Sequence, residues 1–187
     1  MKKRVVYVNG NFVDEDKAKV SVFDRGFLFA DAVYEVTAVI DGKILEWDGH
    51  VKRLERSLKE LDMKFPISET ELLDIHFDLI KKNTLKEGLI YLQVTRGEDD
   101  RSFDYPDESV KPTLVLFTQV KSLAESNIAK TGLKVISVPD MRWGRRDIKT
   151  VQLLAPSMCK MMAKKKNKDD AWMIQDGFIT EGTSNNA

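Results

Sequence analysis

Lys149 is the residue of this sequence best suited to covalent chemistry. It stands in the segment Arg145-Arg146-Asp147-Ile148-Lys149-Thr150. Nearby cations and burial both favour the neutral, nucleophilic form of a lysine amine, whereas Asp147 opposes that effect if it lies close. A lysine held in this way can form a Schiff base with a carbonyl compound. On spacing alone, an ordinary surface lysine is the simpler interpretation.

A second candidate site is the polar run Thr180-Glu181-Gly182-Thr183-Ser184-Asn185-Asn186. It leaves an expected strand as a small, Gly-containing loop, and the amides and hydroxyls of such a loop can hold a polar ligand. The same Gly, Ser and Asn residues are typical of a plain turn. Composition therefore makes Glu181, Thr183 and Ser184 candidates for ligand binding without deciding between the two interpretations.

Arg53, His50 and Tyr34 are candidates for a cleft beside an expected helix. At about 100° per helical residue, His50 lies beside the apolar stripe of that helix and Arg53 about 60° further round the same side. The alternatives are a packed structural histidine and a solvated charge. Tyr34 stands in an apolar strand, where a core position with a partnered hydroxyl is the ordinary expectation.

Arg101 follows Arg96-Gly97, which marks the end of an expected strand, and begins the run Arg101-Ser102-Phe103. A loop arginine can bind a carboxylate through two parallel hydrogen bonds. A surface ion pair is the alternative. The single cysteine, Cys159, lies among methionines in an expected helix, and nothing in its surroundings makes it a nucleophile.

The elements that position these residues begin with two β-hairpins and two helices. Asn9-Gly10 and Asp41-Gly42 are strong hairpin signals between β-branched runs. We expect Asp48 to cap a helix whose apolar residues recur every three or four positions and which ends near Pro66. Ser68 begins a capping box, Ser68-Glu69-Thr70-Glu71, at the start of a second helix.

The remaining pattern predicts an α+β organisation in two parts. We expect residues 1–120 to form an N-terminal α+β domain, residues 121–132 a linker and residues 133–187 part of a second domain. Within these parts, the expected strands cover residues 89–94, 113–117, 133–138, 171–174 and 178–181, and a further helix covers about residues 150–166.

Composition excludes several classes of protein. Thirty Lys and Arg balance thirty Asp and Glu in 187 residues, so the strong basic field of a nucleic-acid or membrane-surface binder is absent. One cysteine and two histidines make a disulfide framework or a metal site unexpected. No apolar stretch is long enough to cross a bilayer. We expect a cytoplasmic protein with no nucleic-acid or membrane partner.

Five motifs in collinear order closely resemble the class IV aminotransferases, the fold type IV pyridoxal-phosphate enzymes, and among them the D-amino-acid transaminases. The resemblance runs through the chain from Tyr7-Val8-Asn9-Gly10 onward. Its motifs are Asp24-Arg25-Gly26-Phe27-Leu28-Phe29-Ala30-Asp31-Ala32-Val33-Tyr34-Glu35-Val36, His50-Val51-Lys52-Arg53-Leu54, Tyr91-Leu92-Gln93-Val94-Thr95-Arg96-Gly97, Asp147-Ile148-Lys149 and Thr180-Glu181-Gly182-Thr183-Ser184-Asn185.

The resemblance implies a cofactor site for pyridoxal 5'-phosphate. Lys149 matches the Schiff-base lysine, which also moves the proton at Cα of the amino acid. Arg53 matches the arginine that holds the phosphate, and Glu181 matches the carboxylate beside the pyridine nitrogen. Thr183 and Ser184 match further cofactor-binding positions.

The resemblance also implies how a substrate is held. Tyr34 and Arg101 match residues that bind the substrate carboxylate, and the arginine comes from the other subunit of a homodimer. D-amino-acid transaminases commonly place a histidine two residues after this arginine, whereas this chain has Phe103. One donor of their carboxylate site is therefore absent, which leaves D-specificity open.

The expected function is a transaminase that moves an amino group between a small amino acid, such as D-alanine, and a 2-oxo acid, such as 2-oxoglutarate. The alternatives in the same family are a branched-chain aminotransferase and an aminodeoxychorismate lyase. The expected fold is a two-domain α+β fold type IV enzyme, with a sandwich-like N-terminal domain and the first part of a β-rich cofactor-binding domain. Because relatives continue well beyond residue 187, we also expect a front portion that is not a competent enzyme by itself.

Overall fold

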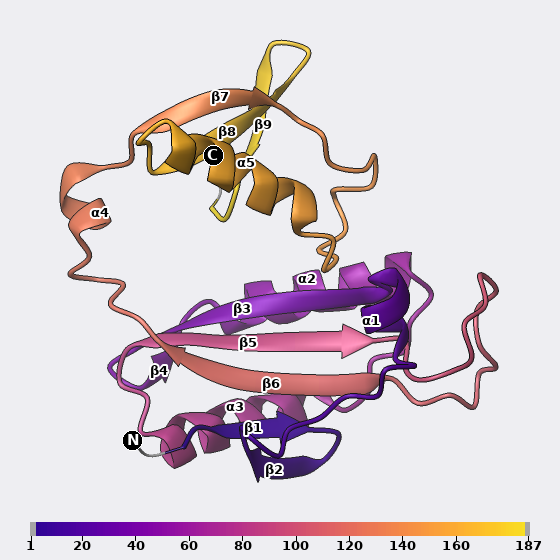
Figure 1. Ribbon diagram of the computed structural model, residues 1–187. Coiled ribbons are helices and arrows are strands. Elements are labelled where there is room, and N and C mark those ends of the chain that lie inside the picture. Colours follow the sequence, from indigo (N-terminus) through magenta and orange to yellow (C-terminus); the bar gives the residue numbers. More distant parts are fainter. Residues whose placement is uncertain (1–2, 186–187) are drawn as a thin grey trace. The chain divides into compact units, whose positions relative to one another are not determined.

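The structure of this chain is a computed structural model that describes residues 3–185 (Figure 1). The chain divides into two compact units. The first comprises Met1–Ala124 together with Ile148–Val151, and the second comprises Glu125–Asp147 and Gln152–Ala187. The short segment Ile148–Val151 therefore belongs to the first unit, although the residues on both sides of it belong to the second.

An antiparallel sheet of six strands forms the first unit, in the order β2-β1-β6-β5-β3-β4. Its strands are β1 (Val5–Val8), β2 (Asn11–Asp14), β3 (Ala32–Ile40), β4 (Lys43–Ile44), β5 (Gly88–Thr95) and β6 (Thr113–Val120). Both expected hairpins are confirmed, β1 with β2 and β3 with β4. Each turn places its two central residues at positive φ, Asn9 and Gly10 in one and Asp41 and Gly42 in the other, as a type I′ turn requires.

Three helices accompany the sheet, namely α1 (Arg25–Phe29), α2 (Trp47–Glu60) and α3 (Glu69–Asn83). The expectation that Asp48 caps α2 is wrong, because Glu46 occupies the N-cap in a left-handed conformation and Asp48 lies in the first turn. In the first turn, the negative charge of Asp48 still stabilises the helix by its interaction with the positive end of the helix dipole. The cap of α3 is confirmed, since the Ser68 hydroxyl accepts a hydrogen bond from the Glu71 amide.

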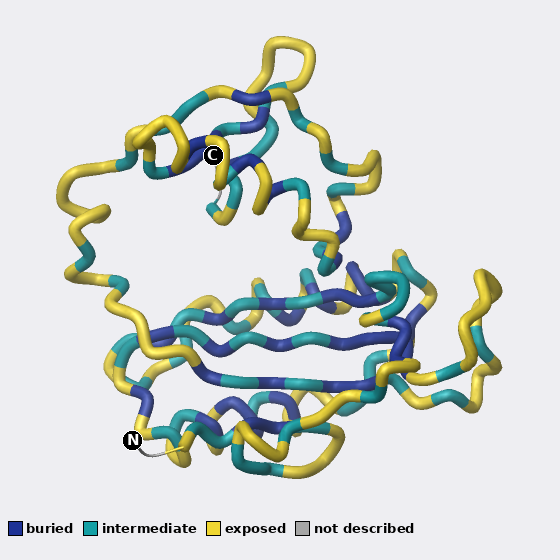
Figure 2. The backbone as a smooth tube through the Cα atoms, viewed as in Figure 1, coloured by how far each residue is buried: buried dark blue, intermediate teal, exposed yellow. Residues whose placement is uncertain are grey.

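The core of the first unit lies between one face of the sheet and helices α2 and α3. Alternate residues of the strands point to this face, so buried and half-buried positions alternate along β3, β5 and β6 (Figure 2). Val33, Ile90 and Leu116 pack there against Leu58 of α2 and Leu79 of α3. The buried faces of the two helices therefore fix them to the sheet by apolar contact.

The second unit has a three-stranded sheet and a smaller core. Its elements are α4 (Asn127–Thr131), β7 (Val135–Pro139), α5 (Leu154–Lys165), β8 (Asp170–Gln175) and β9 (Phe178–Gly182). Strands β7 and β8 are parallel and joined through α5, whereas β8 and β9 are antiparallel. Cys159 lies in α5, as expected, and is fully buried in one cluster with Val138 and Met173. Among the described residues, no helix is long and apolar enough to cross a membrane.

Helix α5 begins later than the sequence pattern predicts. The expected start near Thr150 is wrong, because Ile148–Val151 is hydrogen-bonded to β3, with Thr150 in an antiparallel bridge to Val33. The helix starts at Leu154, and Pro156 lies in its first turn, where proline removes no intrahelical hydrogen bond.

His76 makes the stability of the first unit depend on pH. Burial lowers the pKa of His76 to about 4, while its Nδ1 donates to the Leu72 carbonyl at 2.8 Å. A neutral buried histidine stabilises the fold fully above its unfolded pKa of about 6.5, and this contribution is lost as the pH falls toward 4. We expect the His76-dependent part of the unfolding free energy to fall by about 2–3 kcal/mol between pH 7 and pH 4.5.

The measurement is urea unfolding of the wild type and of His76→Gln at both pH values. Glutamine keeps a donor for the Leu72 carbonyl but does not titrate, so the variant should lose this part of the pH dependence. An equal loss of stability in the two proteins would contradict the role of His76.

Candidate active site

The segment that carries Lys149 is added to the open edge of β3. The Tyr34 amide donates to the Lys149 carbonyl at 3.0 Å, and the Val151 amide donates to the Ala32 carbonyl at 3.2 Å. From the other side, the Lys149 amide donates to the Ser57 hydroxyl of α2 at 3.3 Å. The preceding side chain, Ile148, is buried in the core of the first unit. The backbone of Lys149 is therefore held by the strand, the helix and the core.

The side chain of Lys149 lies against the ring of Tyr34. Its Nζ donates to the Tyr34 hydroxyl at 3.4 Å and lies 4.4 Å from the centre of the ring. Tyr34 stacks on Tyr91, with ring centres 5.7 Å apart, and Tyr91 stacks on Phe117 at 4.9 Å. Burial raises the pKa of Tyr91 to about 12, so its hydroxyl stays neutral near pH 7. The stack limits the movement of Tyr34 and therefore fixes one contact of the amine.

Arg53 is held by Glu35, a buried acid on β3. Arg53 Nε and Nη2 donate to the two oxygens of Glu35, each at 2.7 Å. His50 Nδ1 lies 2.7 Å from Glu35 Oε2 and donates to it, because an ionised carboxylate only accepts. Burial opposes ionisation of Glu35, but the hydrogen bonds from Arg53 and His50 outweigh it and hold the Glu35 pKa below its ordinary value.

The guanidinium of Arg53 keeps one side toward solvent. Its side chain is 39% exposed, whereas that of Glu35 is 4% exposed. The hydrogen bond to Glu35 raises the Arg53 pKa, so the group is a permanent cation. Among residues 3–185, Arg53 Nη1 has no hydrogen-bond partner. The arrangement leaves a fixed positive group with donors available to an anion.

Glu181, Thr183 and Ser184 lie at the end of β9 in the second unit. Glu181 pairs with Met173 of β8, and its Oε1 accepts from the Gly182 amide at 3.2 Å. Thr183 donates its hydroxyl hydrogen bond to the fully buried Asp170, while Ser184 is exposed. The structure therefore gathers these three candidates at one strand end.

Arg101 lies apart from Tyr34 and Lys149. Its guanidinium is 5.4 Å from the centre of the Phe29 ring and 5.6 Å from that of Phe103. Within the described part of the chain, no hydrogen bond or ring contact joins it to Tyr34 or Lys149. The structure thus brings together Lys149 with Tyr34 and Arg53 with His50, and places Arg101 on a separate loop.

Glu35 is the functional residue that sequence reasoning missed. It stands in the same motif as Tyr34, yet no role was expected for it. The available signal was an acidic residue at a position of β3 whose neighbours on the same face, Val33 and Thr37, are buried. A buried acid requires a partner, and the sequence does not say which cation provides it.

The chain belongs to the class IV aminotransferase family, because the amino-transferase class IV family matches residues 32–187. It is similar to the D-alanine aminotransferase of Staphylococcus haemolyticus, with 35% identity over 97% of this chain and 64% of that protein. The D-alanine aminotransferase of Bacillus licheniformis is 35% identical over 97% of this chain and 63% of that protein. The chain thus spans about 64% of the length of the first of these relatives.

Solved structures confirm the expected α+β, fold type IV architecture. The branched-chain aminotransferase of Thermoproteus uzoniensis, solved with norvaline, superposes with a TM-score of 0.80 at 20% identity, over 97% of this chain and 63% of that one. Another branched-chain amino acid aminotransferase, solved with pyridoxamine 5'-phosphate, superposes with a TM-score of 0.83 at 20% identity. That match covers 98% of this chain and 63% of the other.

The Glu35 site leads to a prediction about stability. Replacing Glu35 by glutamine removes the negative charge of a partly exposed pair and replaces one of its two acceptor oxygens by a donor, so we expect the free energy of unfolding at pH 7 to fall by about 1–3 kcal/mol. Because the folded-state pKa of Glu35 is lowered, its contribution is complete above about pH 4.5 and is lost below it. Urea unfolding at pH 7 measures the effect.

Glu15→Gln is the matched control. Glu15 pairs with Arg4, but both side chains are about two-fifths exposed, at 40% and 41%. A surface pair of this kind contributes at most about 1 kcal/mol. If the two variants lost equal stability, the special position of Glu35 would be refuted.

Proposed function

We propose that this chain provides the lysine and much of the site of a pyridoxal-phosphate-dependent transaminase. The reaction moves an amino group between a small amino acid such as D-alanine and a 2-oxo acid such as 2-oxoglutarate. The observation that carries the proposal is the amine of Lys149, fixed against Tyr34 at the edge of β3. The 35% identity to D-alanine aminotransferases supports the D-amino acid as substrate.

The residues present fit a phosphorylated carbonyl cofactor. Lys149 offers a primary amine for a carbonyl group, and Arg53 offers a fixed guanidinium for a phosphate. Glu181 offers a carboxylate for a ring nitrogen, and the exposed Ser184 hydroxyl offers a further donor. Thr183, whose hydroxyl donates to Asp170, is proposed as the neighbouring cofactor-binding position. When bound, pyridoxal phosphate supplies a carbonyl carbon for amino exchange and a ring that accepts electrons from Cα.

The side chains of this chain perform the remaining tasks. Lys149 Nζ takes the proton from Cα of the amino acid and returns it in the reverse reaction, while the Tyr34 hydroxyl keeps the amine in place. Glu35 prevents the Arg53 guanidinium from turning away from the anion that it binds. Glu181 holds a proton on the ring nitrogen by its negative charge.

Arg101 is proposed to bind the substrate carboxylate in the site of the partner subunit of a homodimer. Among the described residues, Arg101 lies on a loop and does not contact Lys149 or Tyr34. This position agrees with a role in the site of the partner subunit. Phe103 supplies no hydrogen-bond donor next to it, so selection among amino acids should be looser than where a histidine stands there.

A branched-chain aminotransferase is the second candidate, since the fold superposes well on such enzymes. Product analysis separates the candidates. A D-transaminase makes an oxo acid from a D-isomer, a branched-chain enzyme makes one from an L-isomer, and an aminodeoxychorismate lyase makes pyruvate and an aromatic amine. Cofactor titration of residues 1–187 beside a full-length relative separates these activities from a fragment that cannot hold the cofactor.

The proposed function predicts that Lys149→Ala lowers transamination by at least about 100-fold, because amino exchange and proton transfer both use this amine. In the wild type, borohydride should attach the cofactor to the peptide that contains Lys149, as detected by mass spectrometry. Lys64→Ala is the control, because Lys64 is exposed and forms a surface ion pair with the exposed Glu108. Full activity in Lys149→Ala would exclude the proposed role.

A further prediction concerns the substrate carboxylate. Arg101→Ala should lower kcat/KM for D-alanine by about 2–5 kcal/mol in transition-state binding, since it removes one partner of a desolvated charge pair. Phe103→His should raise kcat/KM for D-alanine by adding a donor. Steady-state kinetics with D-alanine and 2-oxoglutarate measure both. A loss well under about 2 kcal/mol for Arg101→Ala would indicate an ordinary surface arginine.

A further inference from the structure

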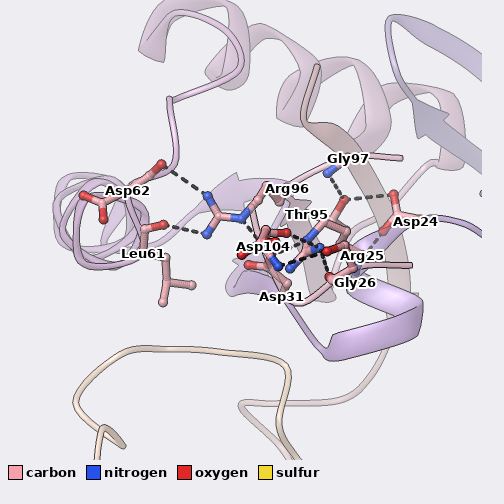
Figure 3. Close-up of polar contacts among 11 residues, drawn as sticks. Asp24, Arg25, Gly26, Asp31, Leu61, Asp62, Thr95, Arg96, Gly97 and Asp104 are labelled. Atoms are coloured by element: carbon pink, nitrogen blue, oxygen red, sulfur yellow. Dashed lines mark hydrogen bonds and ion pairs between the residues drawn. The ribbon is translucent and has the colours of Figure 1, made fainter. Parts of the chain in front are cut away.

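Two buried arginines share one aspartate beside the loop that carries Arg101 (Figure 3). Arg25 Nε and Arg96 Nε both donate to Asp31 Oδ2, at 2.9 Å and 2.7 Å. Arg25 is 3% exposed and Arg96 is 9% exposed. We call these three residues the Asp31 cluster. Burial of two guanidinium groups is costly unless their donors are used, and the proposed chemistry uses neither of them directly.

Arg25 also donates to the loop that carries Arg101. Its Nη1 donates to the Ser102 carbonyl at 2.8 Å and to the Asp104 carbonyl at 3.2 Å. Its backbone amide donates to the Gly97 carbonyl at 2.8 Å. These acceptors lie on both sides of Arg101, in a stretch that contains no helix or strand of its own. One side chain therefore anchors the backbone directly after Arg101.

The rings around Arg25 extend this anchoring to the guanidinium of Arg101. Arg25 lies 4.6 Å from the centre of the Phe29 ring, and Arg101 lies 5.4 Å from the same ring. Phe29 and Phe103 meet edge to face, with ring centres 5.6 Å apart. Phe29 thus holds both arginines by cation–π contact, and α1 carries Phe29 and Arg25 together.

Helix α1 is itself fixed against the end of β5. The Asp24 side chain accepts from the Gly26 amide at 2.8 Å and from the Thr95 hydroxyl at 2.9 Å. A Cβ on Gly26 would lie 2.5 Å from Thr95 Cγ2, so only glycine permits this close approach. The backbone of α1 that carries Arg25 is therefore fixed to the end of β5.

Arg96 connects the same aspartate to the end of α2. It donates to the Leu61 carbonyl at 2.6 Å and to the Asp62 carbonyl at 3.3 Å. These residues follow Glu60, the last residue of the helix that carries Arg53. The Asp31 cluster joins the loop of Arg101 to this helix within one unit.

We propose that Arg25, aligned by Asp31, is a positioning residue that sets the place of Arg101 for the substrate carboxylate. The proposal rests on the proposed function, in which Arg101 binds that carboxylate. A guanidinium on an irregular loop reaches a carboxylate in one geometry only if the backbone beside it is fixed. A displacement of about 1 Å in such a group can cost about 100-fold in rate.

The first test is Arg25→Lys in the complete natural protein. Lysine keeps the positive charge but lacks the planar fork that reaches Asp31 and both carbonyls at once. We expect faster backbone amide exchange in residues 98–105, an increase of about 10-fold or more in KM for D-alanine, and a change of less than about 3-fold in kcat. Cofactor absorption should stay unchanged.

Arg4→Lys is the matched control, because Arg4 also binds one carboxylate and one backbone carbonyl in the same unit, those of Glu15 and Thr118. It should alter neither the exchange of the loop nor KM. If Arg25→Lys does not fold, Asp31→Asn provides the same test, since asparagine keeps the shape of the side chain and weakens its bonds to both arginines.

A double variant separates positioning from general stability. If Arg25 acts through Arg101, adding Arg25→Lys to Arg101→Ala should raise KM by less than about 2-fold further. Full additivity, or a loop that exchanges as slowly in Arg25→Lys as in the wild type, overturns the proposal. If Arg101→Ala leaves KM unchanged while Arg25→Lys speeds loop exchange, the carboxylate role of Arg101 fails and the anchoring of the loop stands on its own.

Discussion

The pairing of residues 148–151 with the open edge of β3 is the constraint on which the candidate site depends. Strand β4 covers only the far end of β3, and at the near end the segment of Lys149 bonds the Tyr34 amide and the Ala32 carbonyl. Successive side chains of β3 point to opposite faces, which sends Tyr34 toward the amine and Glu35 toward α2. One strand therefore positions both the proposed nucleophile and, through Glu35, the proposed phosphate arginine.

Buried carboxylates other than Glu35 also hold arginine side chains in place. Asp31 aligns Arg25 and Arg96 in the first unit. In the second unit, the buried side chain of Asp140 accepts from Arg142 and from the Thr180 hydroxyl, and the hydrogen bond from Arg142 holds its pKa well below the usual range. A buried, ionised carboxylate that accepts several hydrogen bonds fixes the direction of each donor. Loss of any one donor would leave part of the buried charge uncompensated, which is costly.

Local sequence signals predicted most of the fold and less of the site. The hairpins, the capped α3 and the strands follow from turn residues and hydrophobic period, which act over a few residues. Helices α1 and α4, of five residues each, are too short to show a period, so no pattern predicted them. Backbone hydrogen bonds to β3 prevent a helix from starting near Thr150, where the sequence pattern predicted one. The contact of Lys149 with Tyr34 joins positions 115 residues apart, which spacing cannot show.

The membership of residues 148–151 in the first unit has a topological consequence. The chain passes from one unit to the other after residues 124, 147 and 151, so the two units are not successive modules. Expression of residues 1–124 alone would leave the near end of β3 as a bare edge, open to pairing with another strand. In evolution, such an interlaced connection restricts the exchange of either unit as an independent cassette. A single cut near residue 124 would separate Lys149 from β3, although both belong to the first unit.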